Sequence, residues 1–321
     1  MEPIVMGIDV SKKTFDVALL RGERPKNGKF KNTPEGFTML ARWLKKEGVE
    51  GIHACMEATG TYGERLAEYL YEAGYVVSVV NPAKIKGFAQ SELTRTKTDK
   101  ADAALIARFC RAMRPEPWQP PAPEIKKLQA LVRRLDELNG MLTQERNRLD
   151  TADEVVKPSI SEVIKVLEAR IEQVRRLIRD HIDQHPDLKS KRDLLETIPG
   201  IGPATSAMIL AEFGDVARFQ NAKRMASFCG LAPRHRQSGS SVRGKSTLSK
   251  TGSSRIRKAL YMPAVVAMSC NPLIKRFRAR LKESGKCSMV IIAAVMRKLI
   301  HIIYAVLKSG RPFDPAIGAA A

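Results

Sequence analysis

Four carboxylates in the first third of the chain stand where they could bind metal ions. Asp9 lies among apolar residues in the segment Gly7-Ile8-Asp9-Val10, and a carboxylate in such surroundings is costly unless it is paired or bound to a cation. Glu57 ends the apolar segment 51–57, and Asp99 and Asp102 are spaced to share one face of a helix. Carboxylate oxygens are ligands that Mg²⁺ prefers, and a pair of such ions can activate a nucleophile and stabilise the leaving oxygen at a phosphodiester.

Each of these acids also has an ordinary structural explanation. Asp99 at the N-cap and Asp102 at the third helical position would stabilise a helix start without any ligand. Glu57 could be a solvated strand end. Asp9 is the hardest to explain in this way, since its neighbours in the strand are apolar. The metal-site hypothesis therefore depends most on Asp9.

A Ser- and Gly-rich run in the last hundred residues is bordered by positive charges. It extends from Arg234 to Lys245 and contains Ser238, Ser240 and Ser241. A flexible backbone ringed by Arg and Lys can hold phosphate groups, and a serine hydroxyl can act as a nucleophile when something activates it. Spacing by itself favours a nucleic-acid-binding loop with inert serines. The basic residues expected to contact nucleic acid are Arg234, Arg236, Arg243, Lys245 and Lys250.

A second candidate phosphate site is the segment Ile198-Pro199-Gly200-Ile201-Gly202-Pro203, which lies between two helical stretches. Gly200 and Gly202 would let the backbone approach a phosphate, and the N-terminal N–H groups of the next helix could then bind it. This pattern is typical of a helix-hairpin-helix, with a plain tight turn as the alternative. Beside a strongly basic region, phosphate binding is the favoured interpretation.

The charge of the chain is concentrated near its C-terminal end. The whole chain has 55 Lys and Arg against 34 Asp and Glu, a formal net charge of +21. Residues 221–321 hold 20 basic and two acidic residues, so they account for +18 of that total. One region with such an excess predicts a polyanionic partner, with nucleic acid as the first choice and an anionic membrane surface as the second.

Composition also excludes several classes of protein. The five cysteines are odd in number and scattered, which is typical of reduced thiols in the cytoplasm and not of a disulfide scaffold. They have no zinc-ligand spacing with the histidines, and the sequence contains no Walker A loop. The longest unbroken apolar run, 289–296, is too short to span a membrane. We therefore expect a soluble cytoplasmic protein without a membrane partner.

The elements that must position the acids are predicted from hydrophobic periodicity and from Gly and Pro breaks. Strands are expected at 4–10, 15–20, 29–32, 51–57 and 75–81, and helices at 33–46, 62–73, 82–93 and 100–113. The resulting order, β-β-β-α-β-α-β-α, is that of the α/β ribonuclease-H-like fold, a mixed sheet with helices on both faces. Its first and fourth strands are neighbours, so Asp9 and Glu57 are expected to converge.

A proline-rich break at 115–123 predicts a domain boundary. Beyond it, the leucines from Leu128 to Leu142 and the apolar residues from Ile160 to Ile178 repeat in steps of three and four. These are the seams of two helices, which pair either within the chain or with a second protomer. The residues from 188 onward are expected to be mainly helical. The predicted domains are therefore 1–117, 118–187 and 188–321.

These motifs, in this order, resemble those of the DEDD insertion-sequence transposases that are guided by a bridge RNA. The matching segments are GIDVSKKTFDVAL, MEATGTY and NPAKIKGFAQSELTRTKTDKADA, followed by LLETIPGIG, SFCGLAPR, QSGSSVRGKSTLSKTG and RKALYMPA. The resemblance covers essentially the whole chain. It implies a RuvC-like N-terminal domain, a helical coiled-coil segment and a mainly α-helical C-terminal transposase domain.

The resemblance also implies roles for particular residues and partners. Asp9, Glu57, Asp99 and Asp102 would bind Mg²⁺, and Ser238 would be the nucleophile. It further implies a homo-oligomer, from a dimer to a tetramer, and a noncoding bridge RNA that pairs with double-stranded donor and target DNA. If the RNA recognises the DNA sequence by base pairing, the protein itself needs only to bind phosphate backbones. This agrees with a basic chain that shows no recognisable base-reading module.

We therefore expect an RNA-guided DNA recombinase that cuts and rejoins DNA through a phosphoserine link. The nearest alternative is a metal-dependent structure-specific nuclease, such as a junction resolvase, that uses the acids and water. A sugar-kinase-like ATPase would share the first strand and hairpin but needs further Gly-rich phosphate loops. A non-catalytic architectural DNA-binding protein would leave the four acids unexplained.

Overall fold

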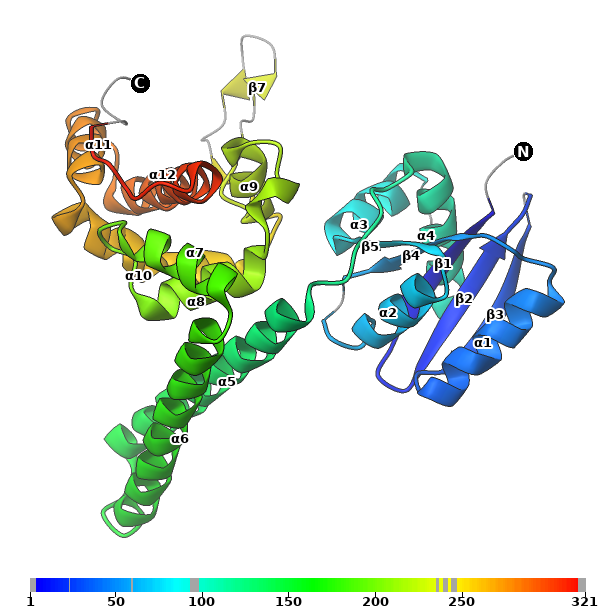
Figure 1. Cartoon of the computed structure of the whole chain (residues 1–321), viewed down its shortest axis with the longest axis horizontal. Helices are drawn as coiled ribbons and strands as arrows, with labels where there is room; N and C mark the ends of the chain where they lie inside the picture. The colour runs from blue at the N-terminus through cyan, green and yellow to red at the C-terminus, as the bar shows by residue number, and fades with distance from the viewer. Residues whose placement is uncertain are drawn as a thin grey trace. The chain divides into compact units, whose positions relative to one another are not determined.

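The computed structural model describes residues 4–22, 24–58, 60–92, 98–234, 237–238, 242–243 and 247–316, with the backbone alone at 237–238 and 242–243. The chain divides into two compact units, one up to Pro120 and one from Pro121 onward. The first is a layered α/β unit and the second is mainly helical (Figure 1). An α/β N-terminal part and a mainly helical C-terminal part were expected from the sequence and are confirmed. The predicted domain bounds 1–117, 118–187 and 188–321 stay predictions.

The first unit is built on a five-stranded mixed sheet with the strand order β3-β2-β1-β4-β5. Its strands are β1 (Val5–Val10), β2 (Thr14–Leu20), β3 (Pro25–Lys31), β4 (His53–Glu57) and β5 (Val76–Val80). The first three strands form an antiparallel meander, β4 runs parallel to β1, and β5 runs parallel to β4. The neighbours β1 and β4 are therefore those that the ribonuclease-H-like order requires.

Strand β3 is longer than the sequence pattern indicated. Gly28, which precedes the predicted strand 29–32, lies inside the strand opposite Val17. A Cβ atom at Gly28 would stand 2.9 Å from the Phe30 ring and 3.2 Å from the Val17 side chain. Glycine at this position therefore makes room for the Phe30 ring within a continuous strand.

Helices cover both faces of the sheet. They are α1 (Pro34–Lys46), α2 (Glu64–Glu72), α3 (Pro82–Ser91) and α4 (Asp99–Met113). Ile8 of β1 packs in the core that α1 and α2 cover, whereas Val5 packs in the core that α3 and α4 cover. This follows from the alternation of side chains along a strand. Side chains near the C-terminal end of β1 that point to the same side of the sheet as Val5 therefore face α4.

The second unit contains two long antiparallel helices and a bundle of shorter ones (Figure 1). The long helices are α5 (Pro123–Thr151) and α6 (Lys157–Asp183). The bundle consists of α7 (Pro186–Glu196), α8 (Pro203–Phe213), the short 3-10 helix η1 (Val216–Arg218), α9 (Ala222–Phe228), α10 (Ser254–Cys270), α11 (Pro272–Glu283) and α12 (Ser288–Ser309). Two short ladders lie between α9 and α10 in the sequence: β6 (Pro233–Arg234) with β9 (Thr247–Leu248), and β7 (Gln237–Ser238) with β8 (Val242–Arg243).

The seam residues of α5 and α6 pack against each other within the chain. Leu138 and Leu142 of α5 form a buried cluster with Ile171 of α6. Nearer the bundle, Leu128 of α5 and Ile182 of α6 join the large core formed with the shorter helices. The long pair is thus anchored in the bundle by its own apolar face.

Helix α12 is long and apolar enough to cross a membrane, but half of its apolar stretch is buried inside the protein. Val295, Leu299 and Ile303 are fully buried in the core of the second unit. Its apolar side chains therefore have a partner within the protein, namely the other helices of the bundle.

Candidate active site

Asp9 and Glu57 occupy matching positions at the ends of two neighbouring strands. Ile8 of β1 is the register partner of Met56 of β4, and Asp9 and Glu57 are the next residues along. Since paired residues of parallel strands face the same side of a sheet, both carboxylates lie on the side that α4 covers. Both side chains are half-buried.

Helix α4 brings the other two acids to this edge of the sheet. It begins at Asp99, and its N-cap is Thr98, whose hydroxyl accepts the N–H of Ala101 at 3.2 Å. The interpretation of Asp99 as an N-cap and Asp102 as its partner is therefore wrong, because a threonine already supplies the cap. Asp99 and Asp102 lie in the first turn, where negative charge is favourable to the helix dipole, and their carboxylates are not engaged in capping.

A glycine in β1 sets how closely α4 approaches the sheet. A Cβ atom at Gly7 would stand 2.1 Å from the carbonyl oxygen of Ala103 and 2.2 Å from the amide nitrogen of Ala107. Backbone therefore packs on backbone two residues before Asp9 and one residue after Asp102. This contact is what places the start of α4 beside the end of β1.

We expect Gly7→Ala to lower the free energy of unfolding of the first unit by about 1–3 kcal/mol or more, because the methyl group would push α4 off the sheet. Both tryptophans, Trp43 and Trp118, belong to this unit, so tryptophan fluorescence during denaturation reports on it selectively.

Gly87→Ala is the matched control. Gly87 lies exposed within α3 with open space around it, and alanine there should stabilise by about 0.5–1 kcal/mol. Equal stability of wild type and Gly7→Ala would contradict the close packing.

Asp99 and Asp102 form one electrostatic group with Asp9. Burial is the largest reason that the pKa of the Asp9 carboxyl is raised above its ordinary value. The carboxylates of Asp102, Asp99 and Asp16, in that order, raise this pKa further. The ammonium group of Lys29 acts in the opposite direction. The site therefore carries more negative charge than its surroundings neutralise.

Two members of this group, Asp16 and Lys29, were missed by the sequence reasoning. Asp16 is the register partner of Asp9 in the β1–β2 pair, and Lys29 is the register partner of Asp16 in the β2–β3 pair. The Lys29 ammonium lies 3.0 Å from a carboxylate oxygen of the buried Asp16 and 3.5 Å from one of Asp99. The signal for Asp16 was available: like Asp9, it is an acid between apolar residues of a strand.

The donor chemistry of this group suits a hard divalent cation. Within the part of the chain that the structure describes, no three His, Cys, Asp or Glu side chains stand close enough to enclose a metal ion as they are. Mg²⁺ typically keeps several waters and takes only one or two carboxylates from a protein, so it does not need such a cage. Excess carboxylate charge and all-oxygen donors both fit this ion.

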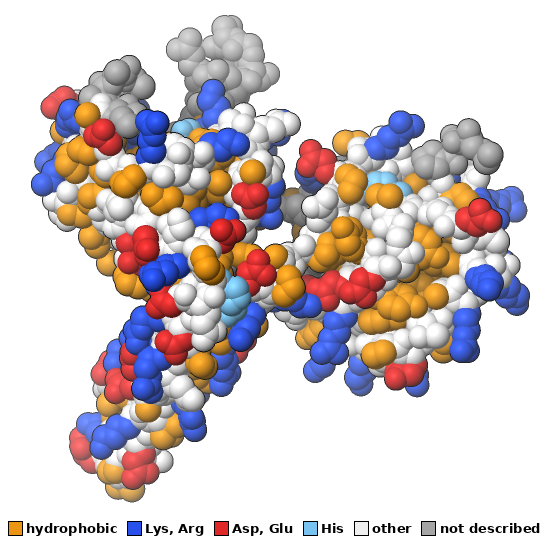
Figure 2. Space-filling model, viewed as in Figure 1, with side chains coloured by type: hydrophobic (Ala, Val, Ile, Leu, Met, Phe, Trp, Pro, Cys, Tyr) orange, Lys and Arg blue, Asp and Glu red, His pale blue; other side chains and the backbone are white. Residues whose placement is uncertain are grey.

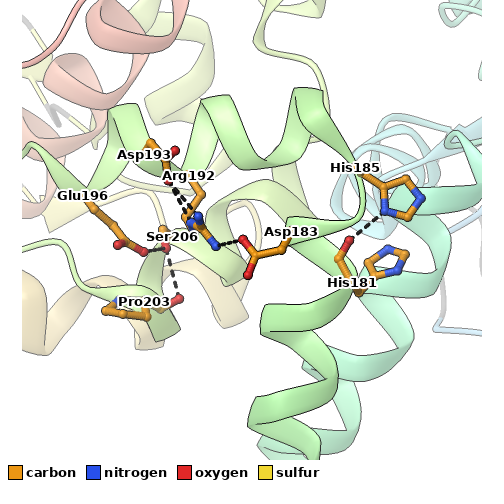
Figure 3. Close-up of polar contacts among 8 residues, drawn as sticks. All are labelled: His181, Asp183, His185, Arg192, Asp193, Glu196, Pro203 and Ser206. Atoms are coloured by element: carbon orange, nitrogen blue, oxygen red, sulfur yellow. Dashed lines mark hydrogen bonds and ion pairs between the residues drawn. The ribbon is translucent and has the colours of Figure 1, made fainter.

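The predicted hairpin is the turn between α7 and α8, and polar contacts fix it on both sides (Figure 3). The buried Ser206 hydroxyl lies 2.8 Å from a carboxylate oxygen of Glu196. In the second half of α7, Arg192 donates hydrogen bonds to Asp183 of α6 at 2.6 Å and to its neighbour Asp193 at 2.8 Å. These contacts tie α7 to the end of α6 and α8 to the end of α7, so they hold the helices on both sides of the turn.

The two glycines of this turn have different surroundings. Gly200 has a φ of +103°, and a Cβ atom there would stand 3.0 Å from the Cα atom of Ala267 in α10. Contact with α10 therefore accounts for glycine at 200 without any ligand. Gly202 is the N-cap of α8 and has open space where a side chain would be. Of the two, Gly202 is the one that leaves room for a phosphate.

The predicted nucleophile and the basic loop belong to the second unit. Ser238 pairs with Val242 in the β7–β8 ladder, and Gln237 pairs with Arg243; the side chains of Ser238 and Arg243 lie outside what the structure describes. Arg236 and Lys245 lie outside the described residues altogether.

The two ends of this loop are described. Arg234 is exposed in β6. Lys250 adopts a left-handed φ of +54° and donates its N–H to the carbonyl of Gly230 at 3.2 Å. The loop is thus closed at its base by backbone contacts, with Arg234 on its outer side.

Comparison with known families gives two matching regions. Residues 6–152 match a family described as a transposase, and residues 192–279 match the transposase family IS116/IS110/IS902. The first region contains all four predicted metal ligands, and the second contains the hairpin glycines and Ser238.

Similar individual proteins come from several bacteria. The pilin gene-inverting protein of Moraxella bovis is 39% identical over 320 residues, which cover 99% of each chain. That of Moraxella lacunata is 38% identical over 320 residues, again 99% of each chain. The uncharacterized 43.6 kDa protein of insertion element IS110 from Streptomyces coelicolor is 25% identical over 166 residues, which cover 52% of this chain and 40% of that protein.

Proposed function

This chain belongs to the IS116/IS110/IS902 family of transposases and is a DNA transposase or recombinase, and we propose that it exchanges strands through a phosphoserine link to Ser238. The observation that carries the metal-assisted part of the proposal is the group of carboxylates around Asp9, whereas the choice of Ser238 follows from the resemblance to the family. Burial and the neighbouring carboxylates raise the pKa of Asp9, so its charged form is costly to the fold, and binding a cation would offset that cost.

Mg²⁺ is the proposed cofactor, and Asp9, Glu57, Asp99 and Asp102 are the residues that would hold it. When bound, the ion supplies positive charge that polarises the phosphodiester and stabilises the leaving oxygen. Lys29 at present provides a positive charge beside Asp99. We infer that Lys29 keeps Asp16 neutralised so that the four other carboxylates remain for the cation.

The proposed reaction conserves the number of phosphodiester bonds. The Ser238 oxygen forms a bond to phosphorus, the bond from phosphorus to one deoxyribose oxygen of the DNA breaks, and the serine proton ends on that oxygen. A hydroxyl end from the other DNA then attacks the phosphoserine, and the serine recovers its proton. Both steps are exchanges of one ester for another, so no external energy source is required. Arg236 and Arg243 are proposed to stabilise the charge that develops on the phosphate.

We infer that a noncoding bridge RNA selects double-stranded donor and target DNA, and that the chain acts as a homo-oligomer, from a dimer to a tetramer. The excess of +18 in residues 221–321 supports contact with phosphate backbones. The α7–α8 turn is proposed as a helix-hairpin-helix, and the α5–α6 pair as a coiled-coil segment that brings protomers together.

A second candidate activity is inversion of a DNA segment. Two relatives that match over nearly their whole length are named as pilin gene-inverting proteins. Strand exchange between two sites in opposite orientation on one DNA molecule inverts the segment between them. Inversion and transposition would therefore use the same chemistry on different arrangements of sites.

The proposal is tested by trapping the covalent intermediate. Purified protein, Mg²⁺, a candidate bridge RNA and end-labelled DNA carrying both sites are mixed and denatured. Labelled DNA that migrates with the protein is the expected result. Cut DNA without any adduct would favour the metal-and-water nuclease instead.

Removal of two basic loop residues is expected to make binding less dependent on salt. Each phosphate contact contributes a slope of about −0.9 to the plot of log affinity against log salt for duplex DNA, or about −0.7 for single strands. If Arg243 and Lys245 each neutralise one phosphate, replacing both by Gln should make the slope shallower by roughly two. An unchanged slope would show that neither residue touches phosphate.

A further inference from the structure

A compact group of basic side chains lies where α12 packs against α9, outside the loop and hairpin already discussed. Arg297, Lys298 and His301 follow one another at helical spacing on one face of α12. Lys223 of α9 stands close enough to influence the pKa of His301 together with Arg297 and Lys298. These four residues are called the α9–α12 basic surface. Figure 2 shows Lys and Arg side chains over these helices.

No described acid neutralises the charge of this surface. Among the described residues, Lys223, Arg297 and Lys298 form no ion pair, and residues 221–321 contain only two acids. The long helices behave differently, since Arg146 pairs there with Glu168 at 2.7 Å and Arg179 with Glu172 at 3.1 Å. Positive charge on α5 and α6 therefore has internal partners, whereas the α9–α12 basic surface is open to an external anion.

His301 gives a second and independent indication. Its Nε2 atom is buried and has no hydrogen-bond partner among the described residues, although buried polar atoms are nearly always paired. Burial, Arg297, Lys298 and Lys223, in that order, lower the pKa of the imidazole. An anionic oxygen arriving here would both pair with the imidazole and relieve the repulsion.

The surface borders the base of the loop that carries Ser238. Arg297 donates a hydrogen bond to the carbonyl of Leu231 at 3.2 Å, and β6 begins two residues later at Pro233. One edge of the loop is thus tied directly to the basic face of α12. A strand held on this surface would continue towards the loop.

We propose that the α9–α12 basic surface binds the phosphodiester backbone of the nucleic acid that the Ser238 loop acts on. Its ligand chemistry is a row of phosphate groups, which DNA and RNA share. The identity of the loop as the reacting site rests on the proposed function, but binding at this surface can be measured without strand exchange.

The test is Lys223→Gln with Lys298→Gln in the full chain. Binding of labelled mixed-sequence duplex DNA, and separately of single-stranded RNA, is followed by fluorescence anisotropy over a salt series. Each lost phosphate contact should make the slope of log affinity against log salt shallower by about one. The slope of the double variant should therefore be shallower than that of wild type by about two. Lys45→Gln with Lys46→Gln removes the same charge from exposed positions at the end of α1 and should leave the slope unchanged.

Replacing Lys223 and Lys298 by Arg should restore the wild-type slope, because charge is kept; this separates phosphate binding from a folding defect. A shallower salt slope for DNA alone, for RNA alone or for both supports the proposal, and it shows which nucleic acid this surface binds. An unchanged slope on both nucleic acids overturns the proposal. So does a loss confined to phosphatidylserine vesicles, which would assign the surface to a membrane. The double variant can have a shallower salt slope even if neither it nor wild type forms a covalent adduct. That combination would contradict the proposed strand exchange through Ser238 but would still support phosphate binding at the α9–α12 basic surface.

Discussion

Replacing Asp9 by Asn is expected to slow strand exchange about a hundredfold or more while nucleic-acid binding stays at the wild-type level. Metal stabilisation of a developing charge is worth several kcal/mol, and about 1.4 kcal/mol corresponds to a tenfold change in rate. Asparagine keeps the size of the side chain but removes the charge at the centre of the acid group. The basic regions of the second unit are untouched, so binding should persist. The measurement compares joined product and bound DNA for the variant and for Glu50→Gln, which changes an exposed carboxylate away from the group.

The same substitution should have the opposite effect on stability. The pKa of Asp9 is raised in the folded protein, which means that the folded state disfavours the charged carboxylate. Ionised Asp9 therefore costs folding free energy at neutral pH, and this cost is absent for Asn. Without divalent metal, Asp9→Asn should denature at a higher concentration of denaturant than wild type, as followed by the fluorescence of Trp43 and Trp118. Adding Mg²⁺ should stabilise wild type more than the variant.

Two results would contradict this account of Asp9. Wild-type rates of strand exchange by Asp9→Asn would exclude it as a metal ligand. Equal stabilisation of wild type and variant by Mg²⁺ would show that the ion binds elsewhere. The second readout does not depend on activity, so it tests the metal site even if the donor and target DNA are not yet identified.

Ser238→Ala is expected to abolish the covalent protein–DNA adduct and all joined product, while DNA and RNA binding are retained. Removing a covalent nucleophile deletes the first bond-forming step, and the loss is several orders of magnitude in comparable enzymes. Ser240→Ala and Ser241→Ala are the matched controls in the same loop and should keep at least partial activity. Denaturing electrophoresis of labelled DNA measures the adduct, and peptide mapping identifies the residue that carries the label.

A label on another residue, or joined product from Ser238→Ala, would show that the nucleophile is wrong. Cleavage that persists in Ser238→Ala but stops in Asp9→Asn would point to the metal-and-water nuclease. The two variants together thus separate the two candidate mechanisms, because only one of them requires the serine.

The order of the elements in the first unit could be predicted because it depends on local features of the sequence. Alternating or continuous apolar runs define the strands, and Thr33 before Pro34 defines a helix start. The adjacency of β1 and β4 followed from that order, and it was enough to expect Asp9 and Glu57 at one edge of the sheet. These inferences need only neighbours in the chain and the rules of chain connection.

The composition of the site was decided by tertiary structure. Asp16 and Lys29 join Asp9 because register places them in one row across three strands, and a shift of one residue would have turned them to the other face. Thr98, and not Asp99, caps α4. Gly7 is needed for the approach of α4, a segment almost a hundred residues away.

In the second unit, too, some features follow from the sequence and others only from the tertiary structure. The sequence alone determined that positive charge gathers in residues 221–321, because charge is a property of composition. It did not determine which of those charges lack a partner, nor that Gly200 packs on Ala267 of α10. Ion pairing and close backbone approach join residues that are distant in sequence, so they are fixed only when the helices pack.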